Sequence, residues 1–304
     1  MKRILFVFID GVGIGAPGPQ NPFDTIDLPG WQALIGGPKW TSSEFTERAE
    51  PELVVRQIDA TLGVEGLPQS GTGQSTLFSG TNCAQLAGRH YGPFPHSSSR
   101  AVLRSQNMFI QCQHIPGALP PVFLNAFPKR FFEAAQKRDR WSSTTRCCLD
   151  ADIPLKTLRD LESGWAIAAD LDGKGLSLVA GASVTTIDID EAAKRMASLS
   201  QKHSLSLFEY FLTDKAGHSE NPNEAKGVLL KLDQLFTGLL KHLDFSNTTL
   251  VVTSDHGNVE DMSTKTHTFN PVPLVALGAS AHHFQDITDL TGVTPAIISG
   301  LKAN

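Results

Sequence analysis

Residues 4–13 read ILFVFIDGVG, an apolar run that ends in an aspartate and a glycine-rich loop. A continuous run with β-branched and aromatic members favours a parallel strand that is buried on both faces of a sheet. Asp10 then lies at the carboxyl end of this strand, the edge at which open α/β sheets bind ligands. The stretch therefore predicts an α/β fold with a functional side chain at the end of its first strand.

Two later strands are predicted to end in the same way. Residues 205–212 and 248–253 are apolar runs, the first followed by Asp214 and the second by Asp255. Parallel strands of one sheet bring their carboxyl ends to one edge. Asp10 and these two acids are therefore expected to converge, although they lie far apart in the sequence.

Carboxylates that are buried close together repel one another unless cations neutralise them. His218 and His256 follow two of the acids, and Asp with His but without Cys suits borderline divalent ions such as Zn²⁺ or Mn²⁺. Each pair alone is a weak signal, because Asp-His-Gly also occurs by chance and Asp214 with His218 is compatible with an ordinary capped helix start. The whole set predicts a metal site.

Charge is distributed unevenly along the 304 residues. The formal net charge is −5, yet residues 89–146 hold nine Lys and Arg against two acids, which gives +7 for this segment and −12 for the rest. Such a reversal indicates a surface that meets an anion, or else a solvated basic helix at 129–140. We expect residues 89–199 to form a small inserted α+β cap subdomain on a catalytic core of residues 1–88 and 200–304.

Composition also argues against several classes of protein. The net negative charge and the lack of a stacked aromatic pattern argue against nucleic-acid binding. The apolar run near the amino terminus is too short for a signal peptide, and no uncharged stretch approaches the roughly 20 residues that span a bilayer. The four cysteines lack C-x-x-C spacing. We expect a soluble, cytoplasmic protein with reduced cysteines and no membrane partner.

Five segments in a fixed order carry a family resemblance. They are Phe8-Ile9-Asp10-Gly11, Ser70-Gly71-Thr72-Gly73-Gln74, Thr213-Asp214-Lys215-Ala216-Gly217-His218, Ser254-Asp255-His256-Gly257-Asn258 and His267-Thr268-Phe269-Asn270-Pro271-Val272-Pro273. Together they resemble the ordered motifs of the alkaline phosphatase superfamily, and within it the branch of cofactor-independent phosphoglycerate mutase and phosphopentomutase. The resemblance covers both ends of the chain but not residues 90–200, and it implies a mostly parallel sheet flanked by helices.

The resemblance also implies two divalent metal ions, Mn²⁺ or Zn²⁺, with Mg²⁺ also possible. The first ion would be held by Asp10, Asp255, His256 and the Ser70 hydroxyl oxygen. The second would be held by Asp214, His218 and His267. His267 thereby takes a role that its spacing alone does not supply, since a single histidine is more often a surface or core residue.

Ser70 is the candidate nucleophile. It lies in a turn that is predicted to feed a helix beginning near Thr72 or Gly73, where unpaired N–H groups can hold phosphate oxygens and a metal can lower the pKa of a hydroxyl. In the mutases that the chain resembles, the nucleophile stands three residues before one Gly and ten before another, which fits Ser70 with Gly73 and Gly80. Thr72 is the second choice, and helix capping is the alternative role for both.

These motifs predict phosphoryl transfer through a phosphoserine, on a small phosphorylated metabolite. Return of the phosphoryl group to another hydroxyl of the substrate would make the protein a phosphomutase, and transfer to water would make it a phosphatase or phosphodiesterase. The chain lacks the Cys-x-Pro-x-Arg run associated with sulfatases. A non-catalytic metal-binding protein is the alternative from another class.

Basic side chains of the predicted cap are the candidates for binding the substrate, because guanidinium groups hold phosphate and carboxylate bidentately. The candidates are Arg100, Arg104, Lys129, Arg130 and Arg146. No motif ranks them, and the sequence makes no prediction about the oligomeric state.

Overall fold

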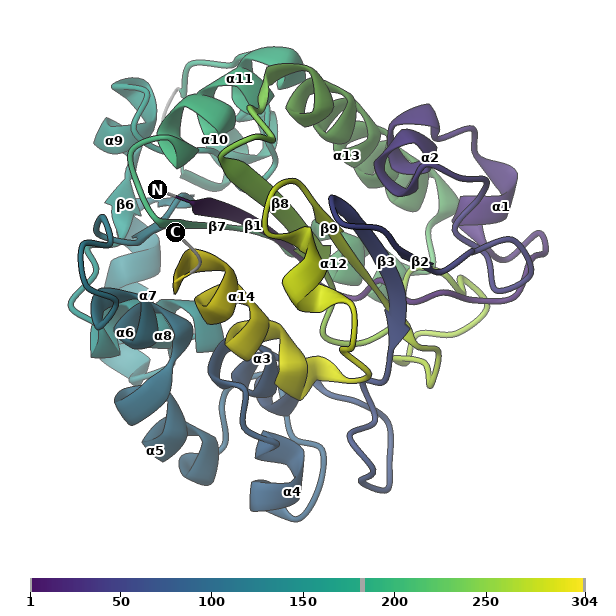
Figure 1. Ribbon diagram of the computed structural model, residues 1–304, viewed down its shortest axis with the longest axis horizontal. Coiled ribbons are helices and arrows are strands. Elements are labelled where there is room, and N and C mark those ends of the chain that lie inside the picture. The colour runs from purple at the N-terminus through teal and green to yellow at the C-terminus, as the bar shows by residue number, and fades with distance from the viewer. Residues whose placement is uncertain (1, 181–183, 303–304) are drawn as a thin grey trace.

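The computed structural model describes residues 2–180 and 184–302. Its main sheet has seven strands in the order β2-β3-β9-β8-β1-β7-β4, and β5 and β6 form a separate pair (Figure 1). The strands are β1 Arg3–Ile9, β2 Arg48–Ala49, β3 Leu53–Ile58, β4 Val122–Phe123, β5 Ala126–Phe127, β6 Lys156–Thr157, β7 Leu205–Tyr210, β8 Thr248–Thr253 and β9 Val272–Leu277. This mixed α/β architecture confirms the predicted fold class.

The centre of the sheet is parallel. β1 pairs in parallel with β7 on one side and with β8 on the other, and β4 continues the parallel set beyond β7. β9 runs antiparallel to both β8 and β3. The carboxyl ends of β8, β1 and β7 therefore lie next to one another at a single edge.

β1 is buried on both faces, as its continuous apolar run predicts. Leu5, Val7 and Ile9 belong to the hydrophobic cluster on one face of the sheet. Ile4 and Phe8 belong to the cluster on the other face. Neither face could accept a polar residue without leaving it unpaired in the core, which explains why the strand lacks polar alternation.

Helices cover both faces of the sheet. Figure 1 shows α11 and α13 on one side and α3 and α14 on the other. The helices are α1 Pro22–Thr25, α2 Pro29–Ile35, α3 Ser70–Ser79, α4 Cys83–Ala87, α5 Ser97–Gln106, α6 Met108–Gln113, α7 Lys129–Arg138, α8 Ser143–Asp150, α9 Leu158–Glu162, α10 Lys174–Ala180, α11 Ile189–Ser200, α12 Leu212–Ser219, α13 Pro222–His242 and α14 Val293–Lys302. Two 3₁₀ helices, η1 Ala281–Phe284 and η2 Leu290–Gly292, precede α14.

Two element boundaries differ from the sequence-based expectation in ways that affect the site. β7 ends at Tyr210, so Asp214 lies in the first turn of α12 and not at the end of the strand. α3 begins at Ser70, two or three residues before the predicted start. Ser70 is therefore the first residue of a helix, and one turn of α12 separates Asp214 from His218.

Much of the segment predicted as an inserted cap, residues 89–199, is built into the core. β4 joins the main sheet, helices α5, α6 and α8 add side chains to the cluster on one face, and α11 adds to the cluster on the other. A small third cluster consists of Ala126, Leu161, Ala166, Ala168, Leu176 and Val184. These helices therefore bury apolar side chains on the main sheet, and a separate cap within residues 89–199 stays a prediction; residues 181–183 lie outside the described residues.

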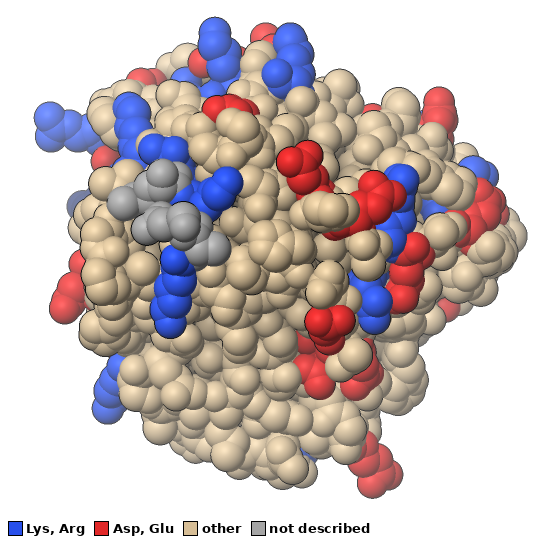
Figure 2. Space-filling view, viewed as in Figure 1, with Lys and Arg blue, Asp and Glu red and all other residues tan. Residues whose placement is uncertain are grey.

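Within the described part of the chain, no helix is both long enough and apolar enough to cross a membrane. The four cysteines are buried and unpaired. On the face shown in Figure 2, acidic side chains gather on the side where α1, α2 and β2 lie, and the lower part around α14 carries few charges.

Candidate active site

The three central strands deliver the candidate ligands. Asp10 directly follows β1, Asp255 and His256 follow β8, and Asp214 lies on α12 just after β7. Direct hydrogen bonds tie the loops together: the Val12 amide donates to the Ser254 hydroxyl (2.9 Å) and the Thr213 hydroxyl donates to the Asp10 carbonyl (2.5 Å). The sheet edge thus fixes the relative positions of the carboxylates.

Two glycines allow this close approach. Gly11 has a φ of +70°, a left-handed conformation, and a Cβ there would lie 2.8 Å from the Cβ of Asp214. A Cβ on Gly73 would lie 3.0 Å from the carbonyl oxygen of Asp255, so α3 packs directly against the loop that follows β8. Both glycines are part of the sequence motifs because any side chain would push the ligand loops apart.

The first ligand group comprises Asp10, Asp255 and His256, which are all buried. His256 Nε2 lies 3.3 Å from Asp10 Oδ1 and 3.4 Å from Asp255 Oδ2. The Ser70 hydroxyl oxygen lies 3.0 Å from the same nitrogen. The structure therefore brings together the four residues that the resemblance assigns to the first metal.

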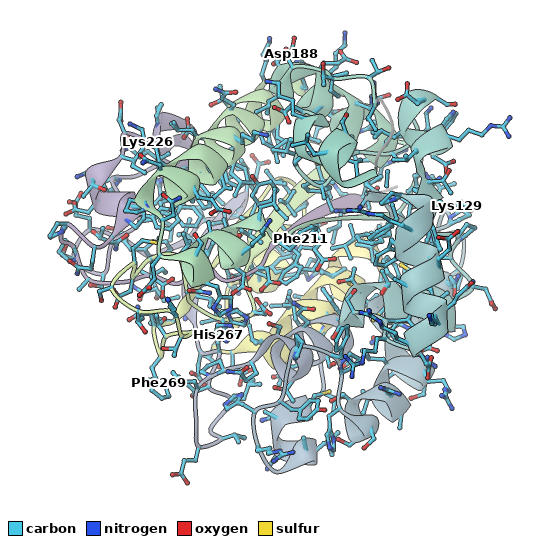
Figure 3. All side chains as sticks on the ribbon, turned by 180° about the vertical axis from the view of Figure 1, so that it is seen from behind. Lys129, Asp188, Phe211, Lys226, His267 and Phe269 are labelled. Carbon is cyan, nitrogen blue, oxygen red and sulfur yellow. The ribbon has the colours of Figure 1, made fainter. Side chains whose placement is uncertain are left out.

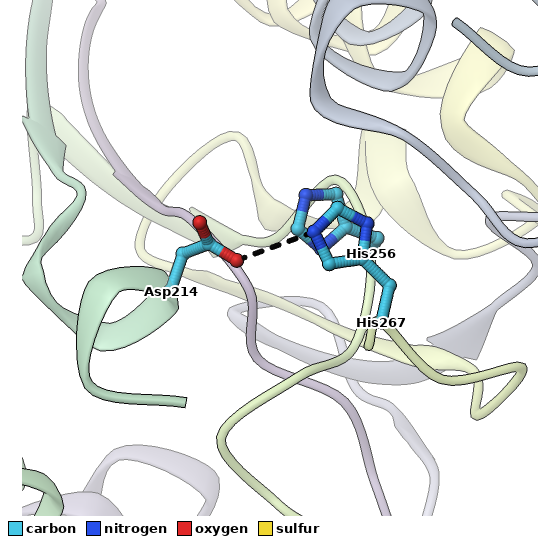
Figure 4. Close-up of side chains that lie close together, drawn as sticks. All are labelled: Asp214, His256 and His267. Carbon is cyan, nitrogen blue, oxygen red and sulfur yellow. Dashed lines mark ion pairs between the residues drawn. The ribbon is translucent and has the colours of Figure 1, made fainter. Parts of the chain in front are cut away.

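The second group adjoins the first. His267 Nε2 lies 3.5 Å from Asp214 Oδ1, as drawn in Figure 4, and 3.2 Å from His218 Nε2. His218 Nε2 lies 3.4 Å from Asp214 Oδ2. The ring of His256 stacks on that of His267 with centroids 3.6 Å apart, and a ligand atom of His256 also lies within reach of Asp214 and His267. The structure places His256 between the two groups, whereas the resemblance assigns it to the first alone.

Backbone carbonyls orient two of the imidazole rings. Nδ1 of His267 lies 2.7 Å from the Pro68 carbonyl oxygen, and Nδ1 of His218 lies 2.6 Å from the Lys265 carbonyl oxygen. When Nδ1–H donates to a carbonyl, Nε2 of a neutral ring carries a lone pair. The two Nε2 atoms face each other at 3.2 Å, an arrangement that needs a cation or a proton between them.

Burial and charge shift the pKa values of the acids in opposite directions. Burial, together with the neighbouring Asp255 and Asp214, raises the pKa of Asp10 well above its usual value. Burial and Asp214 raise the pKa of Asp255 to about 7. Burial opposes ionisation of Asp214 as well, but the His267 and Asn258 side chains lower its pKa to about 2. One charged carboxylate thus lies beside two that resist ionisation.

His256 is neutral, because burial and the nearby His267 lower its pKa to about 3. Its short contacts with Asp10 and Asp255 are therefore not ion pairs. Asp10 Oδ1 and Asp255 Oδ2 are buried without any hydrogen-bond partner. Buried carboxylate oxygens of this kind are costly unless a cation binds them, so the donor set fits divalent metal ions in both groups.

Ser70 and Thr72, the two candidate nucleophiles, have different surroundings. Ser70 is partly buried at the amino end of α3, where Gln69 provides no side-chain cap. The Thr72 hydroxyl is buried and exchanges hydrogen bonds with the backbone of Tyr91, accepting from its amide at 3.1 Å and lying 3.4 Å from its carbonyl. The structure brings Ser70 to the ligands and turns Thr72 toward a neighbouring loop.

Three further side chains support the ligands, and they were not predicted. Gln74 Nε2 donates to Asp10 Oδ2 (3.1 Å), and Asn258 Nδ2 donates to Asp214 Oδ1 (2.7 Å). Glu260 accepts hydrogen bonds from the Gly13 and Asn258 amides at 2.8 and 2.7 Å. Gln74 and Asn258 lie within the quoted motifs, so their position one residue beyond a glycine was the available signal.

A cavity of about 710 Å³ opens from the ligand groups. Asp10, Ser70 and Asp214 line one end, and aromatic side chains line much of the remainder. Figure 3, seen from behind, shows Phe211 near the centre of the molecule, with His267 below it and Lys129 on α7 at the edge. Glu209, whose pKa burial raises to about 7, also lines the cavity.

Of the five basic residues predicted to bind substrate, Arg130 alone lines this cavity. Arg146 forms an ion pair with Asp150 (3.0 Å), and Lys129 forms one with Glu133 (3.4 Å). Arg100 Nε donates to the Pro95 carbonyl (3.4 Å), and Arg104 is exposed on α5. These four therefore do not line the cavity, and their role in binding substrate stays a prediction. Lys215, which was not predicted, does line the cavity.

The family follows from comparison with known proteins. The sequence model of the metalloenzyme superfamily matches residues 2–304. The chain belongs to this superfamily. Within this metalloenzyme superfamily, the chain is similar to 2,3-bisphosphoglycerate-independent phosphoglycerate mutases. The mutase of Ehrlichia canis is 37% identical over 82 residues, 25% of this chain and 16% of the mutase. That of Thermococcus kodakarensis is 28% identical over 138 residues, 42% of this chain and 33% of the mutase.

Solved structures show the same fold. The alkaline phosphatase of the Antarctic bacterium TAB5 matches with a TM-score of 0.52 at 12% identity, covering 99% of this chain and 98% of that one. The phosphoglycerate mutase of Leishmania mexicana matches with a TM-score of 0.52 at 12% identity, covering 99% and 95%. The resemblance read from the motifs is therefore confirmed. The chain spans at most about a third of the length of the two curated mutases named above.

Proposed function

We propose that this metalloenzyme transfers phosphoryl groups with two divalent metal ions and through a phosphoserine at Ser70. One observation carries the proposal: the Ser70 hydroxyl lies at the amino end of α3, 3.0 Å from His256 Nε2, and at the ligand end of the large cavity. A nucleophile, two groups of metal ligands and room for a substrate meet at that point. The mutase and phosphatase relatives support the same chemistry.

The metal ligands would be divided as the resemblance implies, with Asp10, Asp255, His256 and Ser70 in one group and Asp214, His218 and His267 in the other. Bound cations would stabilise phosphate charge and lower the pKa of the Ser70 hydroxyl. The first N–H groups of α3 point along the helix axis toward the same place, so the positive end of the helix dipole favours a phosphate there. Gln74 and Asn258 hold the carboxylates in position.

The transfer consists of two displacements. In the first, Ser70 Oγ loses its proton and bonds to phosphorus as the ester P–O bond breaks, and the released alcohol oxygen takes up a proton. In the second, an oxygen from water or from another hydroxyl of the substrate loses its proton and bonds to phosphorus. The bond to Ser70 then breaks, and Oγ regains a proton. The source of that second oxygen separates a phosphohydrolase from a phosphomutase.

The second displacement has two possible outcomes, hydrolysis and isomerisation of the substrate. The lining of the cavity favours a phosphohydrolase over a phosphomutase. A mutase must hold its dephosphorylated intermediate while the phosphoryl group waits on the enzyme, which requires charged or polar clamps for a small metabolite. Among the described residues, the cations that line the cavity are Arg130 and Lys215, both exposed. Exposed cations bind weakly in water, so an intermediate would exchange with solvent.

The test is a comparison of the wild-type protein and Ser70→Ala, each loaded with Mn²⁺, on a panel of phosphate esters. We expect the wild type to release phosphate or isomerise a substrate and to show a phosphorylated peptide at residue 70 by mass spectrometry. Ser70→Ala should lose about 10³-fold or more in kcat, because the covalent route is removed. Thr72→Ser is the matched control, since it keeps a hydroxyl two residues away and should retain the phosphopeptide.

Turnover by Ser70→Ala at the wild-type rate, or phosphorylation at another residue, would contradict the assignment of the nucleophile. Absence of turnover and of phosphoserine in a wild-type protein that binds two metal ions would instead support the non-catalytic alternative. Product analysis then separates the remaining two outcomes, because a hydrolase gives free phosphate and a mutase gives an isomer.

A further inference from the structure

The cavity has two ends of opposite chemistry. The ligand end is built from carboxylates, imidazoles and the Ser70 hydroxyl. Ten of the nineteen lining residues are apolar, and the wall away from the ligands includes Phe94, Phe127, Phe131 and Phe211. Such a wall desolvates whatever part of a ligand lies beyond its phosphate.

Several polar residues of the wall are already satisfied by the protein. The Asn125 amide group donates to the Glu209 carbonyl (2.7 Å) and accepts from the Glu209 amide (2.9 Å). The Ser142 hydroxyl accepts from the Thr145 amide at the start of α8 (3.3 Å). These groups hold β4, β7 and α8 in place and leave few hydrogen-bonding positions for a ligand. Apart from the buried Glu209 carboxyl and the exposed Arg130 and Lys215, the wall is therefore largely apolar.

The aromatic rings are arranged to accept a flat group. Phe127 and Phe131 stack with their centroids 4.2 Å apart and their planes inclined by 23°. Phe211 is 41% exposed and, within the described residues, makes no contact with another aromatic ring. Because no other ring covers it, Phe211 leaves apolar aromatic surface open beside the ligand residues. Its face is thus available to stack on a bound molecule.

The volume and the charge of the cavity also favour a ligand with a large apolar part. A three-carbon phosphate ester would contact few of the walls of a 710 Å³ cavity. Its carboxylate and hydroxyl groups would lie against phenyl rings that offer them no hydrogen bonds. Arg130 and Lys215 provide positive charge, but both side chains are exposed. A substrate with one phosphate and one large apolar part matches this distribution better than a small polyanion does.

We propose that the substrate is a phosphate ester of a flat, apolar alcohol, with the phosphate at the ligand end and an aromatic ring system against Phe131 and Phe211. This inference rests on the proposed function for the phosphate end and adds the class of the alcohol. Stacking between aromatic rings contributes to the free energy of binding in addition to the contribution of the apolar area that the rings bury. The rings of the wall therefore select the ester by its leaving group.

Binding is measured by calorimetry on the Mn²⁺-loaded protein, with phosphonates that cannot be cleaved. We expect 1-naphthylphosphonate to bind at least ten-fold more tightly than methylphosphonate. Phe131→Ala and Phe211→Ala should each weaken naphthylphosphonate roughly ten-fold and change methylphosphonate by less than two-fold. Trp165→Ala is the matched control: its ring is exposed to a similar extent as that of Phe211 (46% against 41%) but lies outside the cavity, so its substitution should leave both affinities within two-fold.

Equal affinity for the two phosphonates, or an unchanged ratio in both Phe131→Ala and Phe211→Ala, would overturn the inference. Tighter binding of 3-phosphoglycerate or of adenosine 5′-phosphate than of naphthylphosphonate would also overturn it, since the first is a small polyanion and the second carries a polar ring. Metal content and unfolding temperature identify any variant that fails to fold, and the other variant then decides.

Turnover is measured separately, with 1-naphthyl phosphate. Selective binding of naphthylphosphonate without turnover or phosphoserine would contradict the proposed function and leave the inference on the cavity intact. Turnover of small phosphate esters without any naphthyl preference would contradict the inference and leave the proposed function intact.

Discussion

The ligand end of the cavity and its aromatic wall are held in place by different means. At the ligand end, hydrogen bonds to backbone carbonyls and to Gln74 or Asn258 fix the side chains that follow β1, β7 and β8. On the wall, rings on α7 and after β7 pack against one another or remain exposed. At the ligand end, the hydrogen-bond network leaves each ligand side chain few possible orientations. On the wall, the rings make only apolar contacts, which allow the side chains to shift.

This difference separates two properties of an enzyme. A reactive centre needs atoms placed to within fractions of an ångström, which the central strands of a parallel sheet can provide. A binding wall made of rings on a loop, a two-residue strand and a short helix, some of them exposed, has fewer buried contacts and opens more easily. The chemistry of the site is therefore expected to depend steeply on single residues at the ligand end, and its selectivity more gradually on residues of the wall.

The largest effect is expected from Asp255→Asn in the metal-free protein. The pKa of Asp255 is raised to about 7 by burial and by Asp214, from 3.8 for a free side chain. Between pH 4 and pH 7 the unfolded chain has lost this proton while the folded chain retains it, so stability falls as pH rises. The loss for Asp255 is about 4 kcal/mol by pH 8 relative to acid pH, of which about 3 kcal/mol falls between pH 5 and pH 8, and Asp255→Asn removes it. Urea unfolding at pH 5 and pH 8 measures the change.

Two comparisons test the cause of that effect. The exposed Asp286→Asn should leave the pH dependence of unfolding unchanged. Loading the wild type with Mn²⁺ should abolish the part of this loss that comes from the ligand carboxylates, because bound cations replace their protons. The part that comes from Glu209, whose pKa burial also raises to about 7, should remain. A metal-free wild type that is equally stable at both pH values would show that the carboxylates at the ligand end do not repel one another.

A smaller effect is expected from Asn258→Ala, which removes a hydrogen bond to a ligand and no ligand itself. Asn258 is fully buried, and its amide nitrogen donates to Asp214 Oδ1 at 2.7 Å. Loss of such a supporting bond weakens metal affinity by about 10- to 100-fold. Competition titration with a chelator measures this affinity. Asn223→Ala, exposed at the start of α13, is the control, and equal affinities in the two variants would show that Asp214 needs no support.

The ligand end was largely predictable from sequence, and the wall was not. A run such as ILFVFID combines a buried strand with a functional residue at its end, so the pattern itself places residues such as Asp10 and Asp255 at the sheet edge. The side chain of His267 reaches the site from a loop, and only the family resemblance gave it a role. Asp214 was placed at a strand end, although α12 begins two residues before it. Loop conformation and helix starts depend on packing that periodicity does not encode.

The segments that form the wall carry no comparable signal. Phe94, Phe127 and Phe131 come from a loop, a two-residue strand and α7, and Phe211 comes from the other half of the chain. No spacing brings them together, because their proximity results from the tertiary packing of segments that are far apart in the sequence. The charge pattern did not indicate the residues of the wall either. It singled out basic residues such as Arg146, which the structure pairs with a neighbouring acid.

The smallest effect is expected from the substitution of Arg130, a positively charged residue that lines the cavity. Arg130 lines the cavity but is exposed, so its attraction for a phosphate ester is screened by water and salt. Arg130→Ala should raise KM by about three-fold at low ionic strength, without changing kcat or metal content. Arg104→Ala is the matched control on α5, outside the cavity, and should leave KM unchanged. Steady-state kinetics at low and high salt measure this change: an increase in the KM of Arg130→Ala that persists at high salt would show a direct contact that is not screened. An equal increase in the KM of Arg104→Ala would place the binding charge elsewhere on the molecule.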